Sequence, residues 1–206
     1  MTHEIVKKIN RLGHSGFVLM AGDKTVVIDP FQIETCEPAD IILITHSHYD
    51  HCSVPDIDKI KKASTVFVTE PSAAENLTGD VRTLAPGENI QIDDLLIEAV
   101  PAYNTDKSFH PRENNWLGFI ITVDGKKIYH AGDTDLIPEM ESISADIALL
   151  PVSGTYVMTS DEAVAAAKKI KPAIAIPMHY GAIVGTNEDA LRFKDALEGI
   201  LKVIIK

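Results

Sequence analysis

The sequence is poor in cysteine, in long apolar runs and in clustered basic charge. Cys36 and Cys52 are its only cysteines, too few for a disulfide framework in 206 residues, so a reducing compartment is expected. No apolar run is long enough to span a membrane, and residues 1–10 lack the apolar centre of a secretion signal. The net charge of −11, with no Lys/Arg run, argues against general affinity for nucleic acids. We therefore predict a cytoplasmic protein without a membrane partner, and a nucleic-acid partner is disfavoured but not excluded.

The size and composition predict one compact domain. A chain of 206 residues with 45% hydrophobic residues can bury one good core, and a second domain would be cramped. Residues 1–206 are therefore interpreted as a single domain. The sequence does not determine the oligomeric state, and it is compatible with an oligomer.

One short stretch, residues 45–51, has an unusual density of metal-ligating side chains. It reads Thr-His-Ser-His-Tyr-Asp-His and directly follows the apolar run 41–44, which is typical of a buried strand. Three imidazoles and a carboxylate are costly in a core, but they are the ligand types that zinc, iron and manganese share. A metal site is the first hypothesis, and a polar loop with solvated histidines is the alternative.

The order of the expected elements repeats within the chain. Apolar runs at 16–20 and 25–28, joined by a polar turn, predict a hairpin, and Gly118 to Ile121 begins a second segment of the same kind. A buried strand follows each hairpin, at 40–44 and at 145–150. We interpret residues of about 10–75 and 116–180 as two similar halves. If they face each other, the loops after the two buried strands open into one shared cleft.

Helix signals are clearest between and after these strands. Ser53 followed by Pro55 predicts a short helix to about Lys62, and Thr159 with Glu162 forms a capping-box pattern that opens a helix to about Ile170. A last helix is expected over 186–199. Strands are expected at 65–69, within 84–100 around a turn at 93–94, and at 201–205, and residues 101–115 read as a long polar loop.

Three further residues follow apolar segments and could complete a metal site. Asp133 lies in the segment 130–134, where Gly132 would allow close approach of the backbone, and His179 follows the apolar run 174–178. His110 lies in the long loop, where an exposed histidine would be unremarkable. A solvated turn for Asp133 and a buried structural histidine for His179 are the alternatives.

These motifs together resemble the metallo-β-lactamase-fold hydrolases. The resemblance rests on His46-x-His48-x-Asp50-His51, on the segment 130–134 and on Pro177-Met178-His179-Tyr180-Gly181, in that order. Residues 13–15 and the Met-His-Tyr-Gly segment are most similar to a compact branch that includes ascorbate-6-phosphate lactonase. The resemblance implies an α/β fold, a four-layer αββα sandwich of two similar halves, with a dinuclear metal site between the sheets.

The resemblance also implies a ligand set. One metal would be held by His46 and His48, the other by Asp50, His51 and His179, with Asp133 between them. In relatives the third histidine of the first metal follows a segment like residues 100–102, where this chain has Asn104, so we expect His110 to take that role, with Asn104 or an open position as alternatives. Zinc is the first choice among the divalent metals, and manganese or iron would also suit these ligands.

Such a site implies hydrolysis. Two cations about 3.5–4 Å apart would hold a bridging hydroxide that attacks a small ester, lactone or phosphorylated metabolite. Asp50 and His14 are the expected catalytic groups, and His130 is expected to support a ligand. Residues expected to contact substrate are His14, Asn104, Tyr156 and Tyr180. Alternatives are a ribonuclease or cyclic phosphodiesterase on the same metals, or a metal-binding scaffold without turnover.

Overall fold

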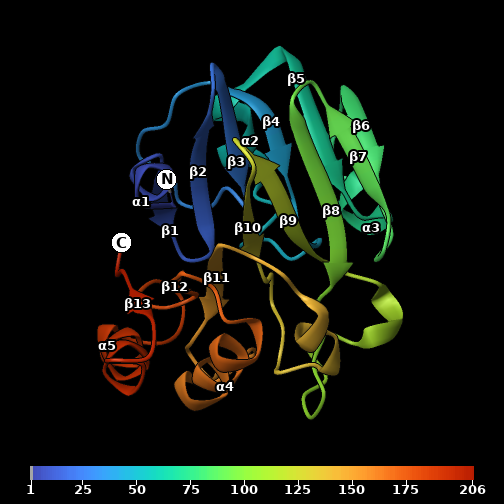
Figure 1. Cartoon of the computed structure of the whole chain (residues 1–206). Helices are drawn as coiled ribbons and strands as arrows, with labels where there is room; N and C mark the ends of the chain where they lie inside the picture. Colours follow the sequence, from blue (N-terminus) through green and yellow to red (C-terminus); the bar gives the residue numbers. More distant parts are fainter. Residues whose placement is uncertain (1) are drawn as a thin grey trace.

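The fold is a sandwich of two β-sheets with helices on both outer sides, as the computed structural model of the chain shows for residues 2–206 (Figure 1). The first sheet has six strands in sequential order: β1 (Ile9–Gly13), β2 (Gly16–Ala21), β3 (Lys24–Ile28), β4 (Ala39–Leu43), β5 (Lys61–Thr69) and β6 (Asp80–Thr83). Within the same described range the second sheet has seven, in the order β13 (Lys202–Val203), β12 (Ile174–Met178), β11 (Ile147–Pro151), β10 (Lys126–His130), β9 (Leu117–Val123), β8 (Leu95–Pro101) and β7 (Asn89–Ile92).

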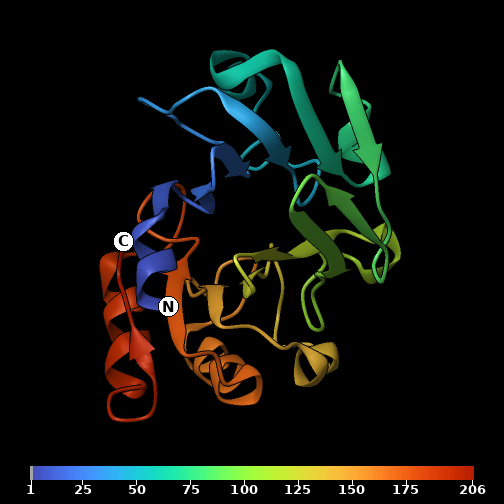
Figure 2. The ribbon, with the colours of Figure 1, turned by 45° about the horizontal axis from the view of Figure 1, so that its top comes forward.

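The helices form the outer layers. They are α1 (Thr2–Lys7), α2 (Val54–Ile60), α3 (Pro71–Ala74), α4 (Ser160–Ile170) and α5 (Asn187–Ala196), with 3₁₀ turns η1 (Arg112–Asn114) and η2 (Pro138–Ser142). Figure 2 shows the orange and red helices α4 and α5 at the bottom and the teal helix α2 at the top, with the strands between them. The predicted four-layer αββα sandwich is confirmed.

Both sheets contain the same pairing pattern. The hairpin β2–β3 is followed by β4 and β5, each parallel to the strand before it, and the hairpin β9–β10 is followed in the same way by β11 and β12. A parallel pair needs a crossover connection, and α2 supplies it between β4 and β5 as α4 does between β11 and β12. Strands β4 and β11 therefore hold equivalent positions in the two sheets, and the loops that follow their carboxyl ends are equivalent as well.

Alternation along the strands divides the core into two parts. In β3 and β4, Ile28 and Leu43 belong to the main cluster, which also contains Phe119 of the second sheet. Their neighbours Val27 and Ile42 belong to a separate cluster with residues of α2. Successive side chains of a strand point to opposite faces, so one face of the first sheet meets the second sheet and the other meets a helix.

The sequence placed most elements correctly, with differences at their ends. The helix expected to Lys62 ends at Ile60, and β5 begins at Lys61. The terminal strand is shorter than predicted, and α1, β1, α3 and β6 were not predicted. Strand β1 pairs antiparallel with β2, a tertiary contact that leaves little local pattern.

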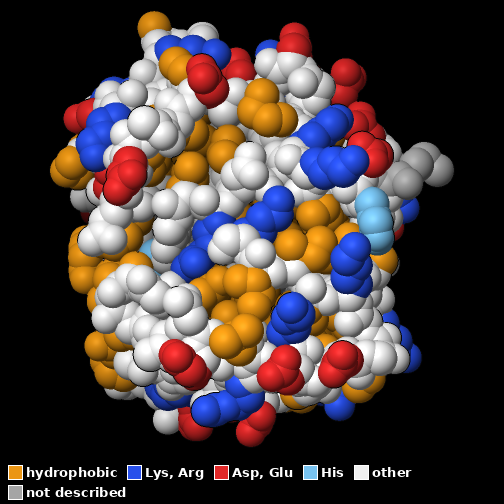
Figure 3. Space-filling model, turned by 90° about the vertical axis from the view of Figure 1, so that its left-hand side faces the viewer, with side chains coloured by type: hydrophobic (Ala, Val, Ile, Leu, Met, Phe, Trp, Pro, Cys, Tyr) orange, Lys and Arg blue, Asp and Glu red, His pale blue; other side chains and the backbone are white. Residues whose placement is uncertain are grey.

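No helix within residues 2–206 combines the length and apolar character needed to cross a membrane. Figure 3 shows the face near α1, where hydrophobic side chains lie among charged ones of both signs.

Candidate metal centre

The candidate ligands lie in loops at the ends of strands. The loop after β4 supplies His46, His48, Asp50 and His51, the loop after β8 supplies His110, and His14, Asp133 and His179 follow β1, β10 and β12. Segments far apart in the sequence therefore deliver their polar groups to one place between the sheets.

The side chains converge in three overlapping groups, each with ligand atoms within 4.8 Å of one another: His14, Asp50, His51 and His179; His46, His48 and His110; and His46, His51 and Asp133. The structure thus brings together every residue that the sequence nominated as a ligand. It also places His14, nominated as a catalytic group, beside them.

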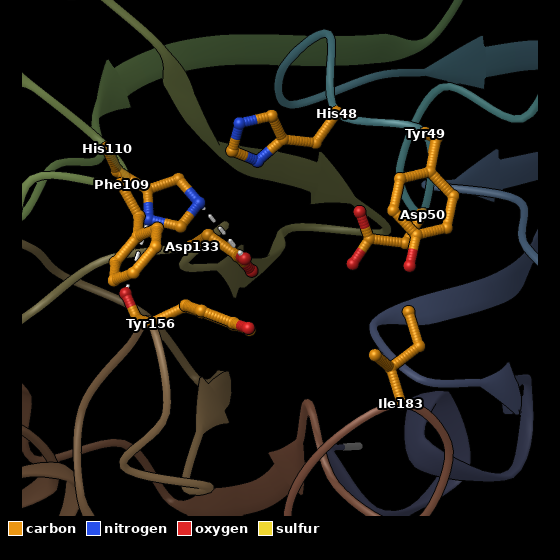
Figure 4. A pocket seen from close by; sticks show the side chains of 8 residues that line it. All are labelled: His48, Tyr49, Asp50, Phe109, His110, Asp133, Tyr156 and Ile183. Atoms are coloured by element: carbon orange, nitrogen blue, oxygen red, sulfur yellow. Dashed lines mark hydrogen bonds and ion pairs between the residues drawn. The ribbon is translucent and has the colours of Figure 1, made fainter.

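Asp133 lies at the centre of the cluster. Its Oδ2 is 3.0 Å from Nε2 of His179 and 3.3 Å from Nε2 of both His51 and His110; Figure 4 marks the contact with His110. None of these three nitrogens has a hydrogen-bonding geometry to a partner, and Asp133 Oδ1 has none either, although all four atoms are buried. Buried polar atoms without partners are rare and costly, so their concentration here fits a cation that these lone pairs would coordinate.

Outer partners orient the imidazoles so that Nε2 points inward. Nδ1 of His51 donates to Asp29 Oδ2 at 2.8 Å, and Nδ1 of His179 lies 2.9 Å from Ser153 Oγ. Ser153 Oγ donates to a backbone carbonyl, which leaves its oxygen to accept from His179. A ligating histidine is normally fixed through its other nitrogen in this way, which sets the tautomer and the ring orientation.

Sequence reasoning missed Asp29. Its side chain is fully buried, its backbone has a φ of 45°, and it also accepts hydrogen bonds from the backbone N–H and the hydroxyl of Thr45. The available signal was its position directly after the buried strand β3, the same signal that marked the ligands.

His110, rather than Asn104, joins His46 and His48. Asn104 Oδ1 accepts from the backbone N–H of His110 at 3.0 Å and lies 3.1 Å from its Nδ1. The Asn104 amide donates to Asp135 and to the carbonyl of Tyr156. Both ends of the Asn104 side chain are thus bonded within the protein. The sequence suggested Asn104 as a possible ligand or substrate contact, but in the structure its side chain orients His110.

His46 and His48 lie against an aromatic wall. Ring centroids of the two histidines are each 4.7 Å from that of Trp116, another residue that sequence reasoning did not nominate. Nδ1 of His46 is 2.9 Å from the hydroxyl oxygen of Thr45, which itself donates to Asp29. Asp29 therefore supports His51 directly and His46 through Thr45.

Burial and charge set the protonation of the cluster. Burial lowers the pKa of His46 well below its usual value, so its imidazole is neutral near pH 7 and can offer a lone pair. Burial alone would raise the pKa of Asp133, but His179 and His51 outweigh it and hold that pKa well below the usual range. Burial likewise opposes protonation of His51, yet Asp133 and Asp29 raise its pKa well above normal. A cation bound here would displace that proton.

His14 lies on the Asp50 side of the cluster. Its Nε2 is 3.1 Å from Asp50 Oδ2, its ring centroid is 4.1 Å from that of His179, and its side chain is fully buried. Burial lowers the pKa of His14. For Asp50, the contact with His14 and the charge of His51 outweigh burial and lower the pKa.

A cavity of about 240 Å³ opens onto the cluster. Its lining is drawn in Figure 4 and consists of His48, Tyr49, Asp50, Phe109, His110, Asp133, Tyr156 and Ile183. Of the side chains that the sequence proposed as substrate contacts, Tyr156 lines this cavity, whereas Tyr180 is buried with its ring under the Arg11 guanidinium at 4.0 Å.

His130 is outside the three ligand groups. Its Nε2 donates to the carbonyl of Ser15 at 2.9 Å, and its Nδ1 accepts from the backbone N–H of Gly132. It therefore ties the end of β10 to the first sheet and holds the turn that precedes Asp133.

Comparison with known proteins shows the family to which the chain belongs. Residues 8–179 match the family model described as the β-lactamase superfamily domain. The chain is 39% identical over 204 residues to a UPF0173 metal-dependent hydrolase of Thermoplasma acidophilum, with 91% of this chain and 88% of that protein covered.

Two solved structures are also similar. One, from Parabacteroides distasonis and assigned to the metal-dependent hydrolases, is 36% identical with a TM-score of 0.87 over 96% of this chain and 91% of the other. The other is Igni18, a metallo hydrolase of Ignicoccus hospitalis, which is 28% identical with a TM-score of 0.80 over 96% and 94%.

The fold, the His/Asp cluster and the domain match define a metal-dependent hydrolase of the metallo-β-lactamase superfamily. Within this class, the chain belongs to the UPF0173 metal-dependent hydrolases.

Proposed function

We propose that the protein is a dinuclear hydrolase. One metal ion would be held by His46, His48 and His110, the other by Asp50, His51 and His179, and Asp133 would contact both. The observation that carries this proposal is the set of buried Nε2 atoms on His51, His110 and His179, which converge on Asp133 Oδ2 without a hydrogen-bonding geometry to any partner. Zinc is the first choice for these ligands, with manganese or iron as alternatives.

Bound metals would supply Lewis acidity and lower the pKa of a water molecule. The chain's own groups have separate tasks. Asp50 lines the cavity with a carboxylate whose lowered pKa keeps it ionised, so it can orient the attacking water and accept its proton. Nε2 of His14, 3.1 Å from that carboxylate, can fix its direction or receive the proton from it.

Under this proposal, the substrate is a small ester, a lactone or a phosphorylated metabolite. The cavity of about 240 Å³ suits a small molecule, and the net charge of −11 disfavours an RNA strand. The resemblance of residues 13–15 and of the Met-His-Tyr-Gly segment to the ascorbate-6-phosphate lactonase branch supports hydrolysis of a lactone or ester. Both cysteines are free, which supports a cytoplasmic location.

Hydrolysis after metal reconstitution tests the proposal. The protein, stripped with a chelator, would be reloaded with zinc, manganese or iron and assayed on esters, lactones and phosphate esters. We expect activity to disappear on stripping, to return with about two ions per chain, and to be absent from His46→Ala. Full activity in a preparation shown to be metal-free would contradict the proposal.

A further inference from the structure

We propose that the mouth of the metal cleft binds an apolar, uncharged part of the substrate, through four side chains that we call the apolar rim: Tyr49, Phe109, Tyr156 and Ile183. This inference rests on the proposed hydrolase function and narrows its substrate class. The reacting bond would lie at the His/Asp cluster, and a hydrocarbon or aryl group attached to it would lie against the rim.

The rim residues are exposed where large hydrophobic side chains are normally buried. Tyr49 is 67% exposed, Phe109 51%, Ile183 38% and Tyr156 37%. Across residues 2–206, eight large hydrophobic side chains are exposed to this degree, and these four line the same cavity. Hydrophobic side chains gathered around a polar centre are typical of a ligand site, because only a bound apolar group removes them from water.

The loops that deliver the candidate ligands also position the rim. Tyr49 lies between His48 and Asp50, and Phe109 directly precedes His110. The rings of Phe109 and Tyr156 pack edge to face with centroids 4.5 Å apart, and the carbonyl of Tyr156 lies 3.2 Å from Nδ1 of His110. In Figure 4 these two rings lie on one side of the opening, and Tyr49 and Ile183 lie on the other. Phe109 and Tyr156 are therefore held beside His110, at one side of the reacting centre.

Among the residues that the structure describes, the cavity offers no lysine or arginine side chain to hold a second anionic group. Lys107, two residues before Phe109, is held by Asp135 at 2.6 Å and by Asp106 at 2.8 Å. Metal ions would face the bond that breaks, but a phosphate or carboxylate at the far end of the substrate would find no cation. The site therefore favours a neutral ester or lactone over a metabolite with a remote phosphate.

A matched series of esters tests this inference on the metal-loaded protein. The 4-nitrophenyl esters of acetic, butanoic and hexanoic acid differ only in apolar length, and the monoester of adipic acid adds a carboxylate at the far end. We expect kcat/KM to rise about fourfold per methylene while the chain stays against the rim, and to fall about tenfold or more for the adipate ester.

Variants of the rim residues test whether the dependence of kcat/KM on chain length comes from the apolar rim. Phe109→Ala should lower kcat/KM for the hexanoate about tenfold with metal content unchanged, and Phe109→Leu should restore part of it. Ile183→Lys should reverse the preference toward the adipate ester. Leu191→Ala, which removes an exposed hydrophobic side chain on α5 outside the cavity, is the control and should leave both esters unaffected.

Binding gives a readout that does not need turnover. Calorimetry with acetohydroxamate and hexanohydroxamate on the loaded protein should show the longer compound binding more tightly, and Phe109→Ala should remove the difference. If no ester, lactone or phosphate ester is cleaved, the proposed function fails, and the binding series still decides the inference.

Rates and affinities independent of chain length, or an adipate ester cleaved as well as the hexanoate, would overturn the inference while leaving a hydrolase. A Phe109→Ala protein that loses only self-association, measured by sedimentation, would assign the rim to a contact between copies and would equally overturn it.

Discussion

The two ligand groups are supported in different ways. His51 is oriented by Asp29, which directly follows the buried strand β3. His179 is oriented by Ser153, which lies just beyond the buried strand β11. His110 instead lies in the long loop between β8 and β9 and is oriented by Asn104 of the same loop. Groups fixed at the ends of strands are more precisely placed than groups on loops. We therefore expect the Asp50, His51 and His179 side to bind its metal more tightly than the His46, His48 and His110 side.

Removing the shared carboxylate should have the largest effect. Asp133 lies within 3.3 Å of Nε2 of three histidines, so Asp133→Ala should abolish hydrolysis and lower metal content on both sides. Metal analysis by mass spectrometry together with the hydrolysis assay measures this. Asp161→Ala, at an exposed carboxylate on α4, is the control. An Asp133→Ala protein with two ions per chain would refute the central place of this residue.

Removing one histidine from each group should separate the two sites. His110→Ala should leave about one ion per chain, because the Asp50, His51 and His179 group remains intact. His179→Ala should also leave about one ion, held by His46, His48 and His110. This ion should dissociate more readily than the one that remains in His110→Ala, because its ligand His110 lies in the long loop between β8 and β9. Chelator-competition titrations of both variants measure the difference. Equal retention in the two variants would contradict the comparison.

Changing the outer partner of the strand-supported group should have a smaller effect. Asp29→Asn keeps the shape but weakens the hydrogen bond to His51 Nδ1, and removing such a partner costs about 10- to 100-fold in metal affinity. The tighter of the two binding steps should weaken most, and the weaker step should change less, because Asp29 reaches His46 only through Thr45. Calorimetric titration of the metal-free protein with zinc measures both steps, and an unchanged tighter step would show that Asp29 has only a folding role.

The corresponding change in the loop should be the smallest. Asn104→Ala removes the acceptor at His110 Nδ1, and the Tyr156 carbonyl at 3.2 Å can take over part of its role. We expect the weaker binding step alone to decrease, by about tenfold, with Asn104→Asp restoring part of the affinity. The same titration measures this, and a change in the tighter step instead would reverse the assignment.

Most of the fold and much of the cluster could be predicted because the signals are local. A polar residue directly after a buried strand marked His46 and His179, and hairpin and capping patterns marked most elements. His46 follows β4 of the first sheet and His179 follows β12 of the second, so the packing of the two sheets on each other brings these residues to one cluster. The resemblance to the metallo-β-lactamase-fold hydrolases then indicated which ligands would share each metal.

The remaining features depend on long-range contacts. His110 and Asn104 could not be ranked firmly, because the loop between them folds back on itself, with the Asn104 N–H donating to the His110 carbonyl. Trp116 carries no local signal of a site, because its packing on His46 and His48 depends on the meeting of the two sheets. The apolar rim joins four side chains from four loops, and no sequence pattern links them.

Anomalous X-ray diffraction at the zinc edge from crystals of the zinc-loaded protein tests the central claim most directly. We expect two peaks, one at about 2.0–2.2 Å from His46, His48 and His110, the other at similar distances from Asp50, His51 and His179, with Asp133 reaching both. A single peak, or none within the cluster, in protein that still hydrolyses its substrate would contradict a dinuclear site.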